Sequence, residues 1–234
     1  MTPLPLPFGG DRRCRTVGLL GGSFNPAHAG HLYISLAALA RLGLDEVWWL
    51  VSPQNPLKPP AGMAPLAERL AAARALARHP RIRVTDIECR FASVHTANTL
   101  RELRRRFPRV RFVWLMGADN LKQIPRWKHW REIFRRTAIA VFARSPYSWA
   151  ALAGRAARRY VRCRVGPWRA HGMAARQPPA WTFLPIRPHP ASATRIRAAA
   201  AAGVPSQATG ASHKQAGQDT LRPTGHGGTH RDFP

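Results

Sequence analysis

Residues 21–31 read Gly-Gly-Ser-Phe-Asn-Pro-Ala-His-Ala-Gly-His, and this stretch decides the fold. An apolar run over 16–20 precedes it and residues 32–42 have helical spacing, so the stretch marks a strand that turns into a helix. Gly21 and Gly22 let a backbone approach a ligand closely, and a helix N-terminus offers N–H groups and the positive end of its dipole. The pattern therefore predicts a turn that binds a phosphate.

Two histidines stand at the start of this predicted helix. His28 and His31 are three residues apart, so both imidazoles project from one face toward the anion. Gly30 lies between them and removes a Cβ from that approach. A single histidine is more often structural than functional. Two that bracket a glycine, directly after a strand and a Gly-Gly turn, favour a catalytic role.

Further apolar runs alternate along the chain with segments of helical periodicity. Continuous apolar strands separated by helices are typical of a parallel sheet that is covered on both faces. The predicted strands span 16–20, 46–51, 82–87, 110–116, 138–143 and 181–186. The fold class is therefore α/β, with a doubly wound parallel sheet in a single domain. In such sheets ligands bind where the strand order reverses, so residues 21–22 and 117–119 are expected across one crevice.

Two helices are predicted from periodicity alone. A helix over 64–78 carries Arg69, Arg74 and Arg78, which we interpret as its solvated face. A second helix over 147–160 has further arginines on its later turns, also interpreted as solvated: Arg155, Arg158 and Arg159.

Length and composition divide the 234 residues into three parts. Residues 1–14 are a Pro- and Gly-rich lead-in, 15–202 form the domain, and 203–234 have the composition of a disordered tail. No apolar run has membrane-spanning length and no signal peptide is indicated, so we expect a cytoplasmic protein without a membrane partner. Three distant cysteines without a C-x-x-C pattern are expected to be free thiols: Cys14, Cys89 and Cys163.

The net charge of +26 would ordinarily indicate a nucleic-acid partner. The basic residues are spread over 1–202 and form no separate arm, so we disfavour nucleic acid. Nearly all of them are arginines, which fits a coding bias toward Arg and Ala together with attraction of anionic substrates. The sequence does not separate these two explanations, and it does not indicate an oligomeric state.

Two loops at carboxyl ends of strands carry single charged groups. Lys58 lies in the Pro-rich segment 52–60, whose limited backbone freedom suits it to reach a phosphate, although a solvated lysine is an equal alternative. Asp119 follows Gly117 after the fourth predicted strand. Its carboxylate is suited to a ribose hydroxyl or a hydrated Mg²⁺, and the alternative is an ordinary helix-capping residue.

Three further features flank this crevice. Trp127 and Lys128 combine an aromatic ring with a cation, as in a site that stacks on a base, whereas Trp114 and Trp130 are expected in the core. Thr96 or Ser93 is expected to cap the helix that follows. A hydroxyl at a helix start and an arginine one turn later form a fork for phosphate oxygens, and the segment 192–197 offers this pattern with Ser192, Thr194 and Arg197.

Residues 21–31 resemble the H-x-G-H signature of the nucleotidylyltransferase superfamily, and their flanks are most similar to bacterial nicotinate-nucleotide adenylyltransferases. The likeness extends over about 15–200, through Gly-Ala-Asp at 117–119 and Ser-x-Thr-x-Ile-Arg at 192–197. Four positions depart from the family pattern, with Leu57 for His, His95 for Tyr, Asn98 for Asp and Ala193 for Ser.

The resemblance implies a Rossmann-like nucleotidylyltransferase fold and transfer of AMP from ATP to nicotinate mononucleotide, with Mg²⁺ accompanying ATP. It implies catalysis by His28 and His31. It implies ATP binding by Gly21, Gly22, Ser23, Phe24, Gly30, Gly117, Asp119, Ser192, Thr194, Ile196 and Arg197. It implies substrate binding by Lys58, Thr96, Trp127 and Lys128. A sister adenylyltransferase with another phosphorylated acceptor, such as phosphopantetheine, and a nucleic-acid-binding protein are the alternatives.

Overall fold

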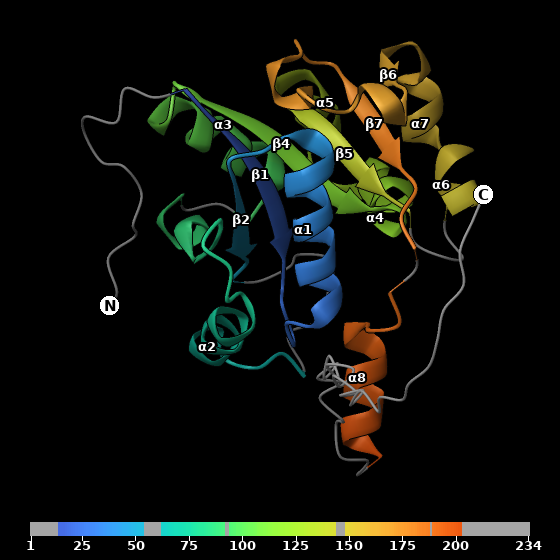
Figure 1. Ribbon diagram of the computed structural model, residues 1–234. Helices are drawn as coiled ribbons and strands as arrows, with labels where there is room; N and C mark the ends of the chain where they lie inside the picture. Colours follow the sequence, from blue (N-terminus) through green and yellow to red (C-terminus); the bar gives the residue numbers. More distant parts are fainter. Residues whose placement is uncertain (1–13, 54–61, 92–93, 144–147, 188, 203–234) are drawn as a thin grey trace, which may run out of the picture.

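The computed structural model describes residues 14–53, 62–91, 94–143, 148–187 and 189–202, and within them seven parallel strands form one sheet (Figure 1). The strand order is β3-β2-β1-β4-β5-β7-β6. The strands span Arg15–Gly22 (β1), Glu46–Val51 (β2), Ile82–Thr85 (β3), Val110–Gly117 (β4), Ala138–Phe142 (β5), Arg164–Val165 (β6) and Trp181–Leu184 (β7). The order confirms the predicted α/β class.

Helices cover both faces of the sheet. They span Ala29–Leu42 (α1), Leu66–Leu76 (α2), Thr96–Arg106 (α3), Ala118–Gln123 (α4), Trp130–Arg136 (α5), Ser148–Leu152 (α6), Arg155–Arg159 (α7) and Ala193–Ala201 (α8). Short 3₁₀ turns lie at Ile87–Phe91, Ile124–Arg126, Val161–Cys163, Pro167–Arg169 and Met173–Ala175. The helices from α3 through α7 pack on one face of the sheet in one buried cluster. Helices α1 and α2 pack on the other face in a second cluster. The sheet is therefore doubly wound, as predicted.

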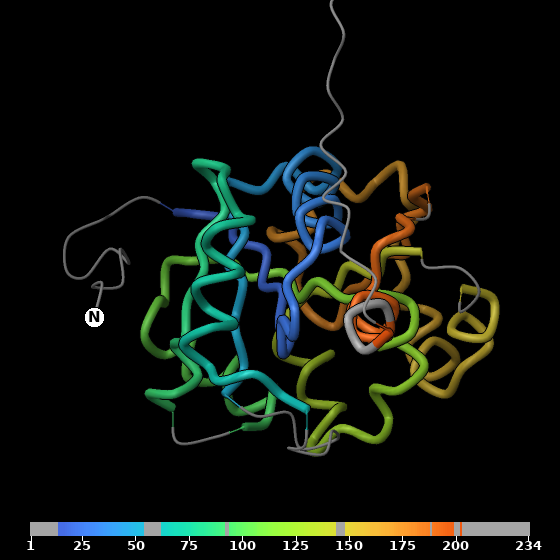
Figure 2. The backbone as a smooth tube through the Cα atoms, turned by 90° about the horizontal axis from the view of Figure 1, so that it is seen from below, coloured from blue at the N-terminus to red at the C-terminus, as the bar shows by residue number. Residues whose placement is uncertain are grey.

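The strand order reverses beside β1. This strand pairs with β2 on one side and with β4 on the other, so the ends of β1 and β4 lie next to each other. Figure 2 looks at this end of the molecule from below, and α8 stands there near the middle. The expectation that residues 21–22 and 117–119 meet at one crevice is confirmed.

A buried carboxylate ties the opposite, amino ends of three strands together. Glu46 accepts hydrogen bonds from Arg15 at 2.6 Å, from Arg83 at 2.8 and 2.9 Å, and from the Trp48 indole at 2.9 Å. Burial opposes ionisation of this carboxyl, but the hydrogen bonds of Arg83 and Trp48 and the charges of Arg83 and Arg15 outweigh it and lower the pKa of Glu46. The ion pairs join β1, β2 and β3 at this end.

Two of the local predictions differ from the structure and a third is confirmed. The helix predicted over 147–160 is two helices, α6 and α7, and a Cβ on Gly154 between them would lie 3.0 Å from the Ala151 carbonyl oxygen. The strand predicted over 181–186 ends at Leu184 and is the seventh along the chain, because β6 precedes it. Three arginines of α7 are exposed as predicted: Arg155, Arg158 and Arg159.

The remaining predictions concern two tryptophans, the cysteines, membrane-spanning helices and the terminal segments. Trp114 and Trp130 are buried, as predicted. The three cysteines are free thiols, as predicted. Among the described helices, none is both long enough and apolar enough to span a membrane. The predicted lead-in up to residue 13 and the predicted tail over 203–234 lie outside the described residues.

Candidate active site

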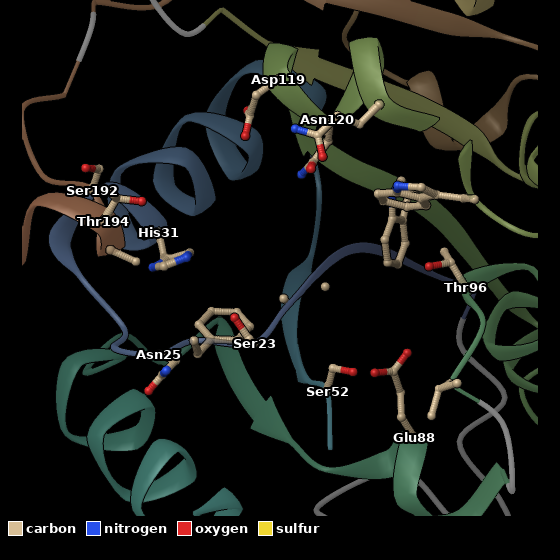
Figure 3. Close-up of a pocket in the computed structure, with 18 of the residues that line it drawn as sticks. Ser23, Asn25, His31, Ser52, Glu88, Thr96, Asp119, Asn120, Ser192 and Thr194 are labelled. Atoms are coloured by element: carbon tan, nitrogen blue, oxygen red, sulfur yellow. The ribbon is translucent and has the colours of Figure 1, made fainter. Parts of the chain in front are cut away.

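A cavity of about 470 Å³ at the carboxyl ends of β1 and β4 brings together most of the residues that the sequence singled out (Figure 3). Its walls include Gly21, Gly22, Ser23, Phe24, His28, His31, Thr96, Asp119, Trp127, Lys128, Ser192, Thr194 and Arg197. Gly30, Gly117 and Ile196 do not line it. Lys58 lies outside the described residues.

The two histidines form the start of α1. His28 is the residue before the first helical turn, and its Nδ1 accepts the N–H of Gly30 at 3.1 Å. The Nδ1 atom of His31 accepts the N–H of His28 at 3.1 Å, and the two ring centroids are 3.9 Å apart. Because each Nδ1 is an acceptor, the proton of each neutral ring is on Nε2. The pair therefore offers two N–H donors at the positive end of a helix.

A chain of contacts from β2 fixes the position of His31. The ring of Phe24 lies 4.6 Å from that of His31 and stacks on Trp49 at 5.1 Å. The Trp49 indole donates to the Ser35 hydroxyl at 2.7 Å, and this hydroxyl donates to the His31 carbonyl oxygen at 2.8 Å. Phe24 has the left-handed φ of 47°, which is strained for a large residue, so this packing holds the loop in its conformation.

The glycines of the motif make room for the protein itself. A Cβ on Gly21 would lie 2.4 Å from the ring of Trp114. A Cβ on Gly30 would lie 2.9 Å from the His28 ring and 3.2 Å from the carbonyl oxygen of Ala191. The Cβ directions of Gly21 and Gly30 are therefore occupied by these neighbours, while Gly21 itself still lines the cavity.

Helix α8 closes the cavity beside the histidines, and Figure 3 shows Ser192 and Thr194 on that side. The Ser192 hydroxyl accepts the N–H of Arg195 at 3.2 Å and so caps the helix. Arg197 donates to the carbonyl oxygen of Asn25 at 2.6 Å and joins α8 to the loop before α1. Because a guanidinium has five N–H groups, Arg197 keeps donors for a phosphate.

The far wall of the cavity comes from α3, α4 and the segment before α5. Asp119 lies in the first turn of α4, after Gly117, whose extended backbone (φ −76°) precedes the helix. Thr96 is the first residue of α3, and the capping position belongs to His95, so the prediction that Thr96 caps the helix is wrong. The alternative cap, Ser93, lies outside the described residues.

Trp127 and Lys128 complete this wall. Trp127 is half-buried and packs against the core cluster that includes α3 and α5, whereas Lys128 is exposed. One face of the Trp127 side chain is therefore fixed by packing while the residue still lines the cavity.

Sequence reasoning placed Arg69 on a solvated face, and this prediction is wrong. The residue is only 3 % exposed. Its guanidinium donates to the carbonyl oxygens of Ser23 at 2.6 Å, Ser52 at 2.8 Å, Ala64 at 2.9 Å and Pro53 at 3.0 Å. Burial lowers the pKa of Arg69, but an arginine remains charged. Arg69 thus binds the loop after β1 to the loop after β2.

Sequence reasoning also missed Glu88, a buried carboxyl in the wall of the cavity. It accepts the Thr99 hydroxyl at 2.9 Å, and it is hydrogen-bonded by Ser52, toward which it points in Figure 3. Burial raises the pKa of Glu88, and these two hydrogen bonds oppose the rise. The N–H of Ser52 donates to the carbonyl oxygen of Gly22 at 2.9 Å, so Glu88 is linked to the loop that precedes the histidines.

Residues 19–199 match the family model described as cytidylyltransferase-like. The chain belongs to the cytidylyltransferase-like family. The resemblance to bacterial nicotinate-nucleotide adenylyltransferases, inferred from the motifs, is confirmed by the names of the proteins most similar to this chain among those compared below.

The relatives match this family member over most of their length. It is 57 % identical to the probable nicotinate-nucleotide adenylyltransferase of Cereibacter sphaeroides over 182 residues, which cover 78 % of this chain and 96 % of that protein. It is 52 % identical to the protein of the same name from a Ruegeria species over 184 residues, with coverage of 78 % and 96 %.

Solved structures share the fold. The nicotinic acid mononucleotide adenylyltransferase of Plasmodium falciparum, in complex with NaAD, superposes with a TM-score of 0.60 at 14 % identity. The superposition covers 79 % of this chain and 83 % of that one. At this identity the likeness is one of fold.

Proposed function

We propose that this chain transfers AMP from ATP to nicotinate mononucleotide, which yields nicotinate adenine dinucleotide and pyrophosphate. The names of relatives that are 57 % and 52 % identical over nearly their full length support this substrate pair. The observation that carries the chemistry is the pair of imidazoles with ring centroids 3.9 Å apart, in each of which Nδ1 accepts a backbone N–H, so that the proton of the neutral ring is on Nε2. A cytoplasmic location is part of the proposal.

The reaction requires little of the protein besides position and charge. An oxygen of the acceptor's 5′-phosphate attacks the α-phosphorus of ATP, the bond to the bridging oxygen breaks, and pyrophosphate leaves with that oxygen. The attacking phosphate is already an anion near neutral pH, so no side chain has to remove a proton. The rate then depends on in-line alignment and on donors for the growing negative charge.

We assign the α-phosphate to His28 and His31, whose donors lie at the N-terminus of α1. A helix N-terminus adds N–H groups and a positive dipole end to the imidazoles. Thr194 and Arg197 are assigned to the β- and γ-phosphates, because α8 places both in the same cavity wall. The leaving pyrophosphate would thus be formed between α1 and α8.

A hydrated Mg²⁺ carried by ATP fits the carboxylate of Asp119. Within the described residues no group of three His, Cys, Asp or Glu side chains is placed to hold a metal ion. Mg²⁺ commonly binds through one carboxylate, several waters and substrate phosphates, so a single carboxylate in the cavity is sufficient. Such an ion, when bound, supplies positive charge to the phosphates.

The acceptor is assigned to the opposite wall. The pyridine ring is placed against Trp127, which is held by the core on one side, and Thr96 and Lys128 offer polar contacts. A nicotinate carboxylate is an anion and its amide is not, so a positively charged protein favours the acid. Screening over about 8 Å at physiological salt leaves most of the discrimination to local contacts.

The direct test is pyrophosphate release from ATP with nicotinate mononucleotide, its amide or phosphopantetheine as the acceptor. We expect the acid to be preferred, and equal use of phosphopantetheine would overturn the assignment. The His31→Ala variant should lower kcat by about 10²-fold or more with smaller changes in KM, because a contact made mainly in the transition state affects the rate. The matched control is His79→Ala, which removes an imidazole outside the cavity.

A further inference from the structure

A second cavity lies at the other end of the sheet. Its volume is about 410 Å³, and its walls include the first residues of β4 and β5, Val110 and Ala138. The proposed active site is at the carboxyl ends of the strands, and the two cavities share no lining residue. Nothing in the proposed reaction uses this second cavity.

Four arginines line the second cavity and no carboxylate does. Arg136 is paired with Glu132 at 3.1 Å, and Arg104 donates to the carbonyl oxygen of Arg136. Arg111 is exposed and Arg176 is half-buried, and neither is in an ion pair with any part of the chain that the structure describes. The cavity therefore carries positive charge that the surrounding protein does not neutralise.

The wall also holds a buried hydroxyl that lacks a hydrogen bond. Thr137 is 2 % exposed, and its Oγ1 has no partner among the described residues. A buried hydroxyl without a partner destabilises the folded protein, and such groups call for an explanation in a ligand or a solvent molecule. Thr137 belongs to the cavity wall, so a rotation of its side chain toward a ligand oxygen would provide the missing partner.

Apart from Gln177, the rest of the wall is apolar. Phe107, Pro108, Phe112 and Ala138 contribute to it, and both phenylalanines are largely buried. An apolar wall next to unneutralised arginines suits a ligand that has a flat ring at one end and a phosphate at the other. The cavity volume lies in the range of about 300–1,000 Å³ that is usual for small-molecule sites.

We propose that this cavity binds a nucleoside phosphate, with the phosphate between Arg111 and Arg176 and the base against the apolar wall. A guanidinium fork matches phosphate oxygens in pairs, which a general positive field does not. A concave site with an apolar wall favours a small nucleotide over the backbone of a nucleic acid, which would follow an open, basic stripe.

The test counts bound ATP on the full chain by equilibrium dialysis at about 0.15 M salt. We expect two equivalents per chain. Changing both cavity arginines, in Arg111→Gln/Arg176→Gln, should weaken one class of site by about tenfold or more while pyrophosphate release stays unchanged. The control is Arg155→Gln/Arg158→Gln, which removes the same charge from exposed positions on α7.

Two results would overturn the proposal. One is a single equivalent of ATP on the parent chain that Arg111→Gln/Arg176→Gln does not weaken. The other is equal weakening by the control pair, which would mean that the excess positive charge, and not the cavity, attracts the nucleotide. The number of ATP equivalents bound does not depend on turnover. The dialysis experiment therefore tests the second cavity independently of the acceptor assay.

Two further measurements test the details of the site. Thr137→Val removes the unpartnered hydroxyl, so it should weaken the second equivalent several-fold and leave the melting temperature unchanged or higher. A purely structural threonine would lower the melting temperature without altering binding. Inorganic pyrophosphate and adenosine should each bind more weakly than ATP, and pyrophosphate that binds equally well would refute the role of the apolar wall.

Discussion

Replacement of Arg69 by lysine tests whether one buried cation organises the active-site loops. Arginine uses Nε, Nη1 and Nη2 to reach four carbonyl oxygens at 2.6–3.0 Å. Lysine keeps the charge, but its ammonium is a compact group on a flexible stem and lacks the planar fork. The Arg69→Lys variant therefore leaves two or more of these carbonyl oxygens without a charged donor.

The magnitude follows from the lost hydrogen bonds. A hydrogen bond to a charged group contributes roughly 1.5–3 kcal/mol, and two are lost, so the free energy of unfolding should fall by about 3 kcal/mol even at the lower end of that range. In a chain of this size the melting temperature should fall by roughly 6–12 °C. The Ser23 carbonyl lies beside Phe24, whose ring supports His31, so a shift of this loop should also lower kcat by about tenfold or more.

The measurements are thermal unfolding and steady-state kinetics of pyrophosphate release, the latter at a temperature where every variant is folded. The control is Arg74→Lys, an identical change on the same helix at an exposed position. If Arg69→Lys melts and turns over like Arg74→Lys, the four contacts do not organise the loops and the reasoning is wrong. A loss of stability with unchanged kcat would limit Arg69 to a structural role.

Three further changes probe other parts of the molecule. Gly30→Ala should lower kcat by about tenfold or more at nearly unchanged melting temperature, because a Cβ there meets the His28 ring at 2.9 Å; an unchanged kcat would refute this. Trp127→Ala should weaken the pyridine nucleotide by roughly 1–3 kcal/mol and spare ATP, and parallel rises in both KM values would contradict the assignment. Glu46→Gln should cost about 2 kcal/mol at pH 7. Because its folded-state pKa is lowered, this contribution is present above the unfolded pKa and disappears as the pH falls through the folded value; a constant difference in acid unfolding curves would exclude it.

The sequence predicts well those features that depend on neighbours along the chain. The strand, turn and helix over 15–42 follow from apolar spacing and from the Gly-Gly turn, and the parallel order follows from repetition of that unit. The second strand, 46–51, has the predicted bounds because all six of its residues are buried and apolar except Glu46. Most of the cavity wall that is formed by the end of β1 and the start of α1 could therefore be predicted.

The roles of Arg69 and Glu88 depend on partners far away in the chain. Arg69 donates to carbonyl oxygens up to 46 residues distant, and backbone carbonyls leave no trace in residue type. One signal was present, because Leu66, Arg69, Leu70 and Ala73 follow the i, i+3, i+4, i+7 spacing of a buried stripe. The charge of arginine favours an exposed position, and the prediction followed that charge and not the place of Arg69 in the stripe. Glu88 gave no such signal, since it lies in a short 3₁₀ turn without helical periodicity.

The structure also separates the two explanations of the arginine content, position by position. A coding bias accounts for an exposed arginine such as Arg155, where lysine would serve as well. It does not account for Arg69, because only a planar fork reaches carbonyl oxygens from separate loops, or for Arg83, which donates to both oxygens of Glu46. Composition bias can supply arginines, but geometry determines which of them lysine cannot replace. Arg111 and Arg176 belong to the second group only if a ligand in the cavity binds both of them, so the nucleotide count decides their class as well.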